Sequence, residues 1–166
     1  KIIFMKRKPN LSNDKAKAVS VVLDSIKKLK NPKFSTVTLL LPTCPLRKAK
    51  DIELGIKSLK KGISTVISVN KSNFPPQFYF SKNKNNVLKS VYKNNPLIKK
   101  ETRIQNISDS FRPNGAFYIS NIKKLLKNKN FFKGKILGLE MPAKRSIDID
   151  TIEDLKLARY FFEKKI

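Results

Sequence analysis

Two carboxylates stand two residues apart near the end of the chain, Asp148 and Asp150 in "RSIDIDTIED". In an extended backbone, side chains two positions apart project from the same face, so both carboxylates can reach one ligand. Mg²⁺ is typically held by one or two protein carboxylates, with water and substrate phosphates completing its shell. The stretch also reads as a helix start, in which Asp150 or Thr151 is the N-cap. Glu153 or Asp154, three residues later, then closes a capping box. The two interpretations are compatible, because one carboxylate can cap while the other faces the ion.

A second polar stretch, "LLLPTCPLRKAKD" at residues 39–51, leaves an apolar run through a turn bounded by two prolines and enters a predicted helix. In open α/β sheets, ligands bind outside the carboxyl ends of the strands, where this turn would lie. Thr43, Cys44 and Arg47 can there offer a hydroxyl, a thiol and a fixed positive charge to a phosphate or carboxylate. A rigid turn with a solvated Arg47 accounts for the same residues. Cys44 is a poor nucleophile candidate, because the sequence contains no histidine to activate it.

A third stretch, "FRPNGAFYIS" at residues 111–120, places an arginine, a proline, an asparagine and a glycine directly before an apolar run. The Arg-Pro pair and the Asn-Gly pair that follows it predict a turn. Arg112, held at the mouth of the following strand, can bind a planar carboxylate through two hydrogen bonds. Asn114 and Tyr118 can add further hydrogen bonds to the same ligand. A hairpin-like turn with a core tyrosine is the alternative.

Hydrophobic periodicity predicts helices and strands that alternate along the chain. Helices are expected over residues 15–30, 52–59 and 122–126 and from about Thr151 onward, and strands over 1–5, 35–41, 64–69, 115–120 and 135–141. This alternation predicts an α/β fold with a mainly parallel sheet flanked by helices. Between Asn70 and Ser110 the pattern dissolves into Asn, Lys and Pro. We interpret this segment as an excursion from a single domain, either a flap or a dimer arm.

The formal net charge of +25 comes from 31 lysines and 6 arginines set against 12 acidic residues. Lys, Asn and Ile all have A/T-rich codons, so genome bias explains the charge at least as well as a polyanionic partner does. No aromatic or helical nucleic-acid reading motif accompanies the charge. We therefore expect no nucleic-acid partner, and keep a basic protein that binds polyanions as the alternative class.

Composition also excludes several kinds of site and compartment. A single cysteine excludes an internal disulfide, and the absence of histidine excludes a His/Cys zinc cluster and a Ser-His-Asp triad. No run reaches the roughly 18 apolar residues of a membrane span, and the apolar part of "KIIFMKRKPN" is too short for a signal peptide. We expect a cytoplasmic protein with no membrane partner.

Taken together and in this order, three stretches resemble the acylneuraminate cytidylyltransferases, also called CMP-sialic acid synthetases: "LLLPTCPLRKAKDIE", "TRIQNISDSFRPNGAFYIS" and "MPAKRSIDIDTIEDLKLA". The resemblance covers nearly the whole chain, including "KPNLSNDKA" near its start. It implies a Rossmann-like nucleotide-diphospho-sugar transferase fold. The implied reaction is attack by the anomeric hydroxyl of a nonulosonic acid, a sialic-acid-like sugar, on the α-phosphorus of CTP, giving a CMP-sugar and pyrophosphate. Positioning and charge neutralisation carry most of the catalysis in such a transfer.

The resemblance also implies roles for individual residues. Asp148 and Asp150 fall on the Mg²⁺-binding acids of the family, which makes them the implied catalytic and metal-binding residues. Lys8 stands where the family has an arginine near the nucleotide. The sugar pocket is implied at Arg112, Asn114, Tyr118, Phe131 and Phe132, although the two phenylalanines are by type more often core residues. Arg103 matches an arginine that reaches the sugar carboxylate from the partner subunit, so a homodimer is implied, with residues 70–110 as the crossing arm.

Several residues depart from the family pattern. Leu41 stands where the family has a sugar-contacting glutamine, so the substrate is open between a sialic-acid-like sugar and legionaminic acid or another bacterial nonulosonate. Cys44 and Ala18 each replace a serine, and Lys8 keeps a charge but loses the two-point hydrogen bonding of arginine. The family's first strand and CTP-binding loop have no counterpart before "KIIFM". Residues 1–166 are therefore expected to be one cytidylyltransferase domain without that part, which as a fragment could also be non-catalytic.

Overall fold

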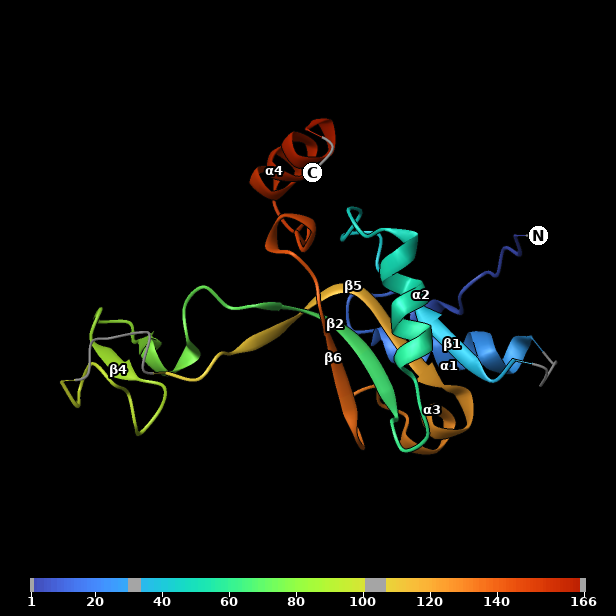
Figure 1. Ribbon diagram of the computed structural model, residues 1–166, viewed down its shortest axis with the longest axis horizontal. Coiled ribbons are helices and arrows are strands. Elements are labelled where there is room, and N and C mark those ends of the chain that lie inside the picture. Colours follow the sequence, from blue (N-terminus) through green and yellow to red (C-terminus); the bar gives the residue numbers. More distant parts are fainter. Residues whose placement is uncertain (1, 30–33, 101–106, 165–166) are drawn as a thin grey trace. The chain divides into compact units, whose positions relative to one another are not determined.

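A computed structural model describes residues 2–29, 34–100 and 107–164. The chain forms two compact units (Figure 1). Unit 1 comprises Lys1–Val69 and Asn114–Ile166, and unit 2 comprises the intervening Asn70–Pro113. The predicted site residues that the structure describes lie in unit 1, apart from Arg112.

Unit 1 contains most of the regular elements. In chain order they are η1 (Pro9–Leu11), α1 (Ala18–Lys28), β1 (Thr36–Leu39), α2 (Ala49–Ser58), β2 (Thr65–Lys71), β5 (Phe111–Asn121), α3 (Ile122–Asn128), β6 (Ile136–Glu140), η4 (Ala143–Arg145) and α4 (Ile152–Glu163). The last two residues of β2 and the first three of β5 belong to unit 2. The helices and strands expected from periodicity are therefore present, with the exceptions described below.

The sheet of unit 1 has the strand order β1-β5-β2-β6. β5 is antiparallel to β1, and β2 is parallel to β6. Ser120 of β5 bonds to Ser64 beside β2, and Phe117 bonds to Ser68, so residue numbers rise along one strand as they fall along the other. β5 therefore runs against both of its neighbours. The α/β expectation is confirmed, but the sheet is mixed rather than mainly parallel. Two of its three strand pairings are antiparallel, because β5 returns from unit 2 beside the strand that leads into it.

α2 covers one face of the sheet. Ile52 of this helix packs against a buried cluster that includes Val66 of β2 and Phe117 and Ile119 of β5. Gly55 faces the sheet, and a Cβ there would lie 2.5 Å from Cδ1 of Ile119. The close approach of α2 to β5 therefore depends on glycine at this position.

α1 and α3 cover the opposite face. Val22 of α1, Leu125 of α3 and Phe131 form a second buried cluster, against which Leu39 of β1 and Tyr118 of β5 pack. Because successive side chains of a strand point to opposite faces, β5 contributes Phe117 and Ile119 to one cluster and Tyr118 to the other. The sheet thus lies between two helical layers, as the sequence pattern predicted.

Buried hydroxyl groups line the junction of β2 and β5. Thr65 Oγ1 lies 3.3 Å from Ser120 Oγ, which donates to the carbonyl of Ser64 at 2.9 Å. Ser68 Oγ accepts from the backbone N–H of Phe117 at 2.9 Å and donates to the carbonyl of the same residue at 3.1 Å. We call these three side chains, Thr65, Ser68 and Ser120, together with their partners the hydroxyl seam. Each of the three hydroxyls has a hydrogen-bond partner inside the sheet.

The expected turn at residues 114–115 is wrong, because β5 runs without interruption through Phe111–Asn121. Gly115 nevertheless has a φ of 78°, and the N–H of Ala116 is bonded to the side chain of Asn114 at 3.1 Å. A glycine with positive φ inside a strand is typical of a bulge. The turn-forming residues thus distort the strand, and strand pairing on either side prevents a reversal of the chain.

The strand expected at residues 1–5 is also absent from the part of the chain that the structure describes. Ile2, Ile3 and Phe4 are exposed and form no ladder. An apolar β-rich segment becomes a strand only where a neighbouring strand pairs with its backbone groups. The described residues provide no such neighbour here.

Unit 2 contains a short 3-10 helix, η2 (Pro76–Phe78), and a two-stranded sheet of β3 (Phe80–Lys82) and β4 (Leu88–Ser90). Phe78, Asn70 and Asn95 are among its buried residues. An ion pair between Lys71 and Asp109, 2.7 Å long and exposed on both sides, lies at the ends of the segment. The segment expected to be irregular thus has a compact structure of its own.

Within the described residues, none of the helices has the length and apolar character needed to cross a membrane.

Candidate active site

Asp148 lies between η4 and α4, in a stretch without regular secondary structure. Its side chain lies beside the bulge of β5, since a Cβ on Gly115 would be 3.4 Å from Oδ2 of Asp148. Burial raises the pKa of the Cys44 thiol to about 11, and the negative charge of Asp148 contributes to that rise. The pKa of Tyr118 is raised by the same two causes, burial first and Asp148 second. A half-buried carboxylate, a thiol and a phenol are thus gathered at one end of the sheet.

One carboxylate oxygen of Asp148, Oδ1, is buried and has no hydrogen-bond partner among the described residues. Leaving such a group unsatisfied costs free energy, and such atoms often mark a place for an ion or a ligand. Asp150, two residues further on, is exposed. The helix-capping alternative is also present in the structure, but at the next residues, because Thr151 is the N-cap of α4 and closes a capping box with Asp154. Asp150 donates its backbone N–H to Asp154 Oδ2 at 3.2 Å, but the carboxylates of Asp148 and Asp150 take no part in the box.

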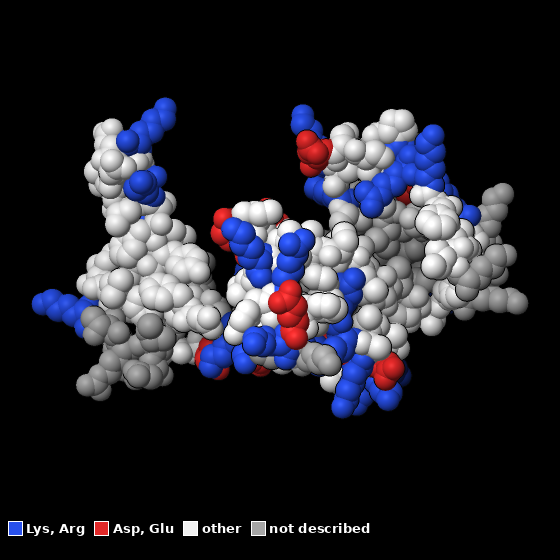
Figure 2. Space-filling view, turned by 90° about the horizontal axis from the view of Figure 1, so that it is seen from above, with Lys and Arg blue, Asp and Glu red and all other residues white. Residues whose placement is uncertain are grey.

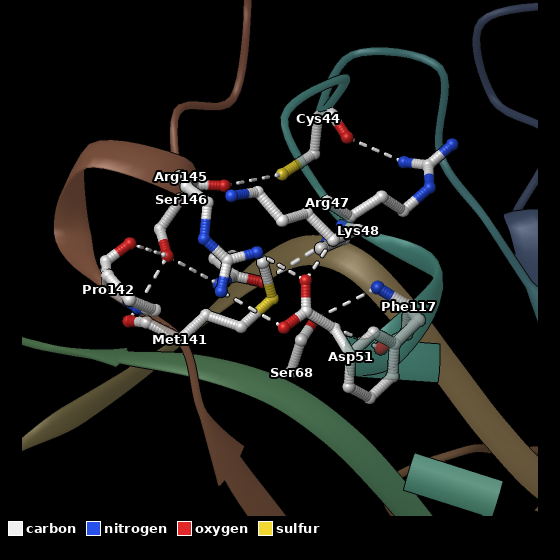
Figure 3. A network of polar contacts seen from close by, with 12 residues as sticks. Cys44, Arg47, Lys48, Asp51, Ser68, Phe117, Met141, Pro142, Arg145 and Ser146 are labelled. Carbon is white, nitrogen blue, oxygen red and sulfur yellow. Dashed lines mark hydrogen bonds and ion pairs between the residues drawn. The ribbon is translucent and has the colours of Figure 1, made fainter. Parts of the chain in front are cut away.

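The segment that carries Asp148 is fixed to other elements (Figure 3). The guanidinium of Arg145 makes two hydrogen bonds to the carboxylate of Asp51, Nη1 to Oδ2 and Nη2 to Oδ1, the second 3.0 Å long. The carbonyl of Arg145 also accepts the thiol of Cys44 at 3.9 Å. The N–H of Ile149 donates to the carbonyl of Thr43 at 2.8 Å. Both sides of Asp148 are thereby attached to the region from β1 to α2.

Asn114 attaches the segment that carries Asp148 to β5 as well. Its Nδ2 donates to Ser146 Oγ at 2.8 Å, and that hydroxyl donates to the carbonyl of Pro142 at 3.0 Å. Asn114 is only 2% exposed. Two of its hydrogen-bonding groups are therefore used inside the protein, toward Ser146 and toward the bulge of β5. A direct contact between Asn114 and a sugar stays a prediction.

Arg47 holds the loop that follows β1. Its Nη1 donates to the carbonyls of Leu41 and Cys44 at 2.7 and 2.6 Å. The guanidinium is partly buried, and one of its faces is used to fix the turn that carries Thr43. Nη1 of Arg47 therefore fixes the turn, as the rigid-turn alternative expects. Binding of a ligand by the rest of the guanidinium stays a prediction.

Three predicted sugar-binding residues lie together. The ring of Tyr118 lies 5.6 Å from that of Phe131 and 5.9 Å from that of Phe132, measured between centroids. Phe131 is buried and Phe132 is half exposed. The three rings line a cavity of about 230 Å³ whose other walls are Lys17, Ala18, Val19, Leu39, Leu41 and Asn130. The cavity is mainly apolar, with one amine, one amide and one phenol among its walls.

The remaining predicted residues are placed as follows. Lys8 is exposed and lies 3.7 Å from a carboxylate oxygen of Asp24 in α1. A second cavity, of about 410 Å³, lies next to this region and is lined by Arg7, Leu11 and the end of β1, among others. Arg112 is exposed and belongs to unit 2. Arg103 lies outside the described residues.

Sequence reasoning missed the pair of Asp51 and Arg145, which is central to this region. The pair is separated by 94 residues, so no local pattern connects its members. A weak signal exists for Asp51 alone, since an acid three residues after the start of a helix is typical of a capping box. The backbone N–H of Lys48 does donate to Asp51 Oδ2, at 2.7 Å.

The donor set at Asp148 and Asp150 fits a hard cation such as Mg²⁺. Both are oxygen donors, and the buried Oδ1 of Asp148 has no competing hydrogen bond among the described residues. Among all the residues that the structure describes, no cluster of three or more His, Cys, Asp or Glu side chains is positioned to hold a metal. A site of two carboxylates matches Mg²⁺, which keeps several waters and takes substrate phosphates as ligands.

Comparison with known proteins gives two kinds of similarity. No protein-family model matches the chain. It is 28% identical over 170 residues to the N-acylneuraminate cytidylyltransferase of Streptococcus agalactiae, covering 99% of this chain and 39% of that protein. It is 30% identical over 161 residues to the pseudaminic acid cytidylyltransferase of Campylobacter jejuni, covering 95% and 67% of the two chains. The chain thus spans about two fifths of the streptococcal relative and two thirds of the Campylobacter one.

A solved structure shares the fold. The 4-diphosphocytidyl-2C-methyl-D-erythritol synthase of Anaerococcus prevotii superposes with a TM-score of 0.60 at 13% sequence identity. The superposition covers 89% of this chain and 67% of that protein. At this identity the similarity concerns the fold alone, a Rossmann-like α/β arrangement, which confirms the predicted fold class.

Proposed function

Because this chain belongs to the family of the acylneuraminate and pseudaminic acid cytidylyltransferases, we propose that the complete protein transfers CMP from CTP to a nonulosonic acid. The anomeric hydroxyl oxygen of the sugar forms a bond to the α-phosphorus, and pyrophosphate leaves. The hydroxyl proton is lost to a base or to water. We place this reaction in the cytoplasm, where CTP is available.

The observation that carries this proposal is Oδ1 of Asp148, which is buried and has no hydrogen-bond partner among the described residues. Together with Asp150, it would hold Mg²⁺ at the end of the sheet where Thr43 and Tyr118 also lie. When bound, the ion supplies charge neutralisation on the triphosphate as pyrophosphate leaves. The protein's own contribution is a carboxylate whose backbone is fixed on both sides, so that little reorganisation is needed when the substrates bind.

The aromatic cavity supports the binding of the sugar beside that carboxylate. Tyr118, Phe131 and Phe132 offer apolar faces to the acyl or deoxy parts of a nonulosonic acid, and Lys17 offers a positive charge at the wall. Leu41 lines the same cavity and cannot donate to a sugar hydroxyl. The cavity accommodates part of a nine-carbon sugar, and the two relatives named above act by name on different sugars. The choice between them stays open to experiment.

The test of this function uses the complete protein with CTP, Mg²⁺ and N-acetylneuraminic, legionaminic and pseudaminic acids, with mass spectrometry of the products. A CMP-sugar is expected with at least one acid. Asp148→Asn and Asp150→Asn should each lower turnover by at least about 100-fold, since loss of outer partners of metal ligands already costs 10- to 100-fold. Glu53→Gln, at an exposed position of α2, is the control. Absence of product with every sugar would contradict the function, and unchanged turnover in Asp148→Asn would contradict the metal site.

We further propose that unit 2 joins two copies of the protein. Large apolar side chains are exposed on this unit: Phe74, Tyr79, Val87, Leu88, Val91, Tyr92, Leu97, Ile98 and Phe111. Exposed apolar surface of this density is typical of an interaction surface. The occupant we expect is a second copy, because the resemblance to the cytidylyltransferases implies a homodimer. Arg103, predicted to reach the partner's sugar, lies outside the described residues.

Sedimentation velocity measures this association directly. The wild-type protein should sediment as a dimer, and Leu88→Asp combined with Ile98→Asp should sediment as a monomer, because two buried charges would oppose association. Leu54→Asp, an exposed apolar residue of α2 in unit 1, is the matched control and should leave the dimer intact. A wild-type monomer at micromolar concentration would exclude the proposal.

A further inference from the structure

The pair of Asp51 and Arg145 differs in burial and in geometry from the other ion pairs between described residues. Both side chains are about 15% exposed, and two parallel hydrogen bonds join them. Lys71 and Asp109, in contrast, are more than half exposed and meet through one contact. Two-point pairing of a guanidinium with a carboxylate fixes the orientation of both groups, which a single contact does not.

Asp51 is itself held from a second direction. Its Oδ2 accepts the backbone N–H of Lys48, so the carboxylate belongs to the first turn of α2. Burial alone raises the pKa of Asp51, but the hydrogen bonds from Arg145 and from the Lys48 backbone outweigh it and leave the pKa below its usual range. Arg145 thus binds a carboxylate whose position is set by a packed helix.

The chain from Arg145 to Asp148 is short, so the position of the guanidinium restricts where the aspartate lies. Between them, Ser146 is bonded to Asn114, and beyond them Ile149 is bonded to Thr43. Asp148 Oδ1 has no hydrogen bond of its own among the described residues. Its orientation must therefore come from the bonds of its neighbours in the chain, of which the bond from Arg145 to Asp51 of α2 is the charged one.

We propose that Asp51 and Arg145 are positioning residues for the carboxylates of Asp148 and Asp150, and that they set the affinity of that site for a divalent cation. This inference rests on the proposed function. A partly buried ion pair is weak support for stability, because desolvation offsets much of its attraction. Holding a ligand-bearing segment in place is the role that the geometry supports, as partners of metal ligands do in other sites.

The test compares Arg145→Lys, Asp51→Asn and the exchanged pair Asp51→Arg with Arg145→Asp in the complete protein. Glu53→Gln, which removes an exposed carboxylate from the same helix as Asp51, is the control. Two readouts are measured for each variant: the binding of Mn²⁺, from the loss of the free-ion EPR signal, and the Mg²⁺ concentration that half-saturates CMP-sugar formation. Thermal unfolding is recorded alongside.

The two disrupting variants should weaken Mn²⁺ binding and raise the half-saturating Mg²⁺ concentration, each by about 10-fold, the size found for partners of metal ligands. Turnover should recover at high Mg²⁺. Arg145→Lys keeps the charge but loses the two-point bonding, so it should show the effect with a smaller loss of thermal stability than Asp51→Asn. The exchanged pair should restore part of the Mn²⁺ affinity.

A purely structural role gives a different result. It would lower the melting temperature and the active fraction while leaving Mn²⁺ affinity and half-saturating Mg²⁺ unchanged, and that outcome would overturn the inference. A wild-type protein that binds no Mn²⁺ would overturn it as well. A third outcome separates the two proposals: the wild type forms no CMP-sugar but binds Mn²⁺ more tightly than Arg145→Lys and Asp51→Asn do. The proposed function then fails and the positioning role stands.

Discussion

Cys44 shows at the scale of one residue how the fold changes chemistry. It is the single cysteine of the chain and is completely buried, with a pKa raised to about 11 by burial and then by the charge of Asp148. The thiolate is the reactive form of cysteine, so a raised pKa lowers reactivity at neutral pH. The sequence predicted a poor nucleophile from the absence of histidine, and the structure adds a second physical cause.

We predict that Cys44 of the folded chain reacts with iodoacetamide at pH 8 at least about 100-fold more slowly than a free thiol. The factor follows from a pKa raised from 9.0 to about 11, which lowers the thiolate fraction by that amount. Alkylation is followed by mass spectrometry. The same chain in denaturant is the control and should react like free cysteine. Equal rates in the folded and denatured chain would show that the thiol is neither buried nor near a negative charge.

The candidate site was predictable from the sequence to differing degrees. Composition and spacing singled out Asp148 and Asp150, and the aromatic residues predicted around the sugar do line one cavity. The bonds of Arg47 to backbone carbonyls could not be predicted. Every residue has a backbone carbonyl, so the sequence does not indicate which carbonyls an arginine will contact. Nor could the bond between Asn114 and Ser146, whose members are 32 residues apart.

At the scale of elements, segments with a clear hydrophobic pattern were predicted, whereas the distorted part of β5 and the shortest strands were not. The apolar stripe of α1 and the β-branched and apolar residues of β1 favour their structures locally. The Asn-Gly pair at residues 114–115 is a strong turn signal, yet pairing of β5 with two neighbours outweighs it. β3 and β4 are each three residues long, too short for any period to be recognised.

Gly55 allows a prediction about one element. A methyl group at this position would lie 2.5 Å from Cδ1 of Ile119 and 3.1 Å from the ring of Phe117, so Gly55→Ala should push α2 from the sheet. Overpacking costs about 1–3 kcal/mol, whereas alanine in a helix gains at most about 1 kcal/mol over glycine. We therefore expect a net loss of about 1 kcal/mol in the free energy of unfolding, measured by chemical denaturation.

Glu53→Ala, at an exposed position of the same helix, is the control for Gly55→Ala. It should change the free energy of unfolding by no more than about 0.5 kcal/mol, as surface substitutions usually do. A stabilised Gly55→Ala variant would mean that α2 does not approach β5 as closely as described.

At the scale of the whole molecule, the positive charge is the most unusual property. In the face seen in Figure 2, Lys and Arg side chains lie in several separate places, with acidic side chains among them. This distribution gives no single basic surface on that face of the kind that polyanion-binding proteins use. The charge of +25 instead produces self-repulsion, which opposes the compact state.

Salt should therefore stabilise the protein. The Debye length falls from about 30 Å at 0.01 M to about 10 Å at 0.1 M, so repulsion between distant lysines is screened over that range. We expect the melting temperature to rise between 0.01 and 0.2 M sodium chloride, as measured by differential scanning fluorimetry. Sucrose of equal osmolarity is the control for effects other than screening. A melting temperature that falls with salt would indicate that attractive ion pairs dominate.

The hydroxyl seam between β2 and β5 has a consequence for the register in which these two strands pair. In most hairpins a tight turn determines which residues of the two strands face each other. Here the whole of residues 72–110 separates the two strands, so no turn can align them. In the native alignment Ser68 satisfies both backbone groups of Phe117, and Ser120 satisfies Ser64. A slip of one residue would bury these hydroxyls without partners and turn the apolar side of β5 toward the wrong helix. The hydroxyl seam thus disfavours a shifted register of β2 and β5, an effect that tight turns have in most hairpins.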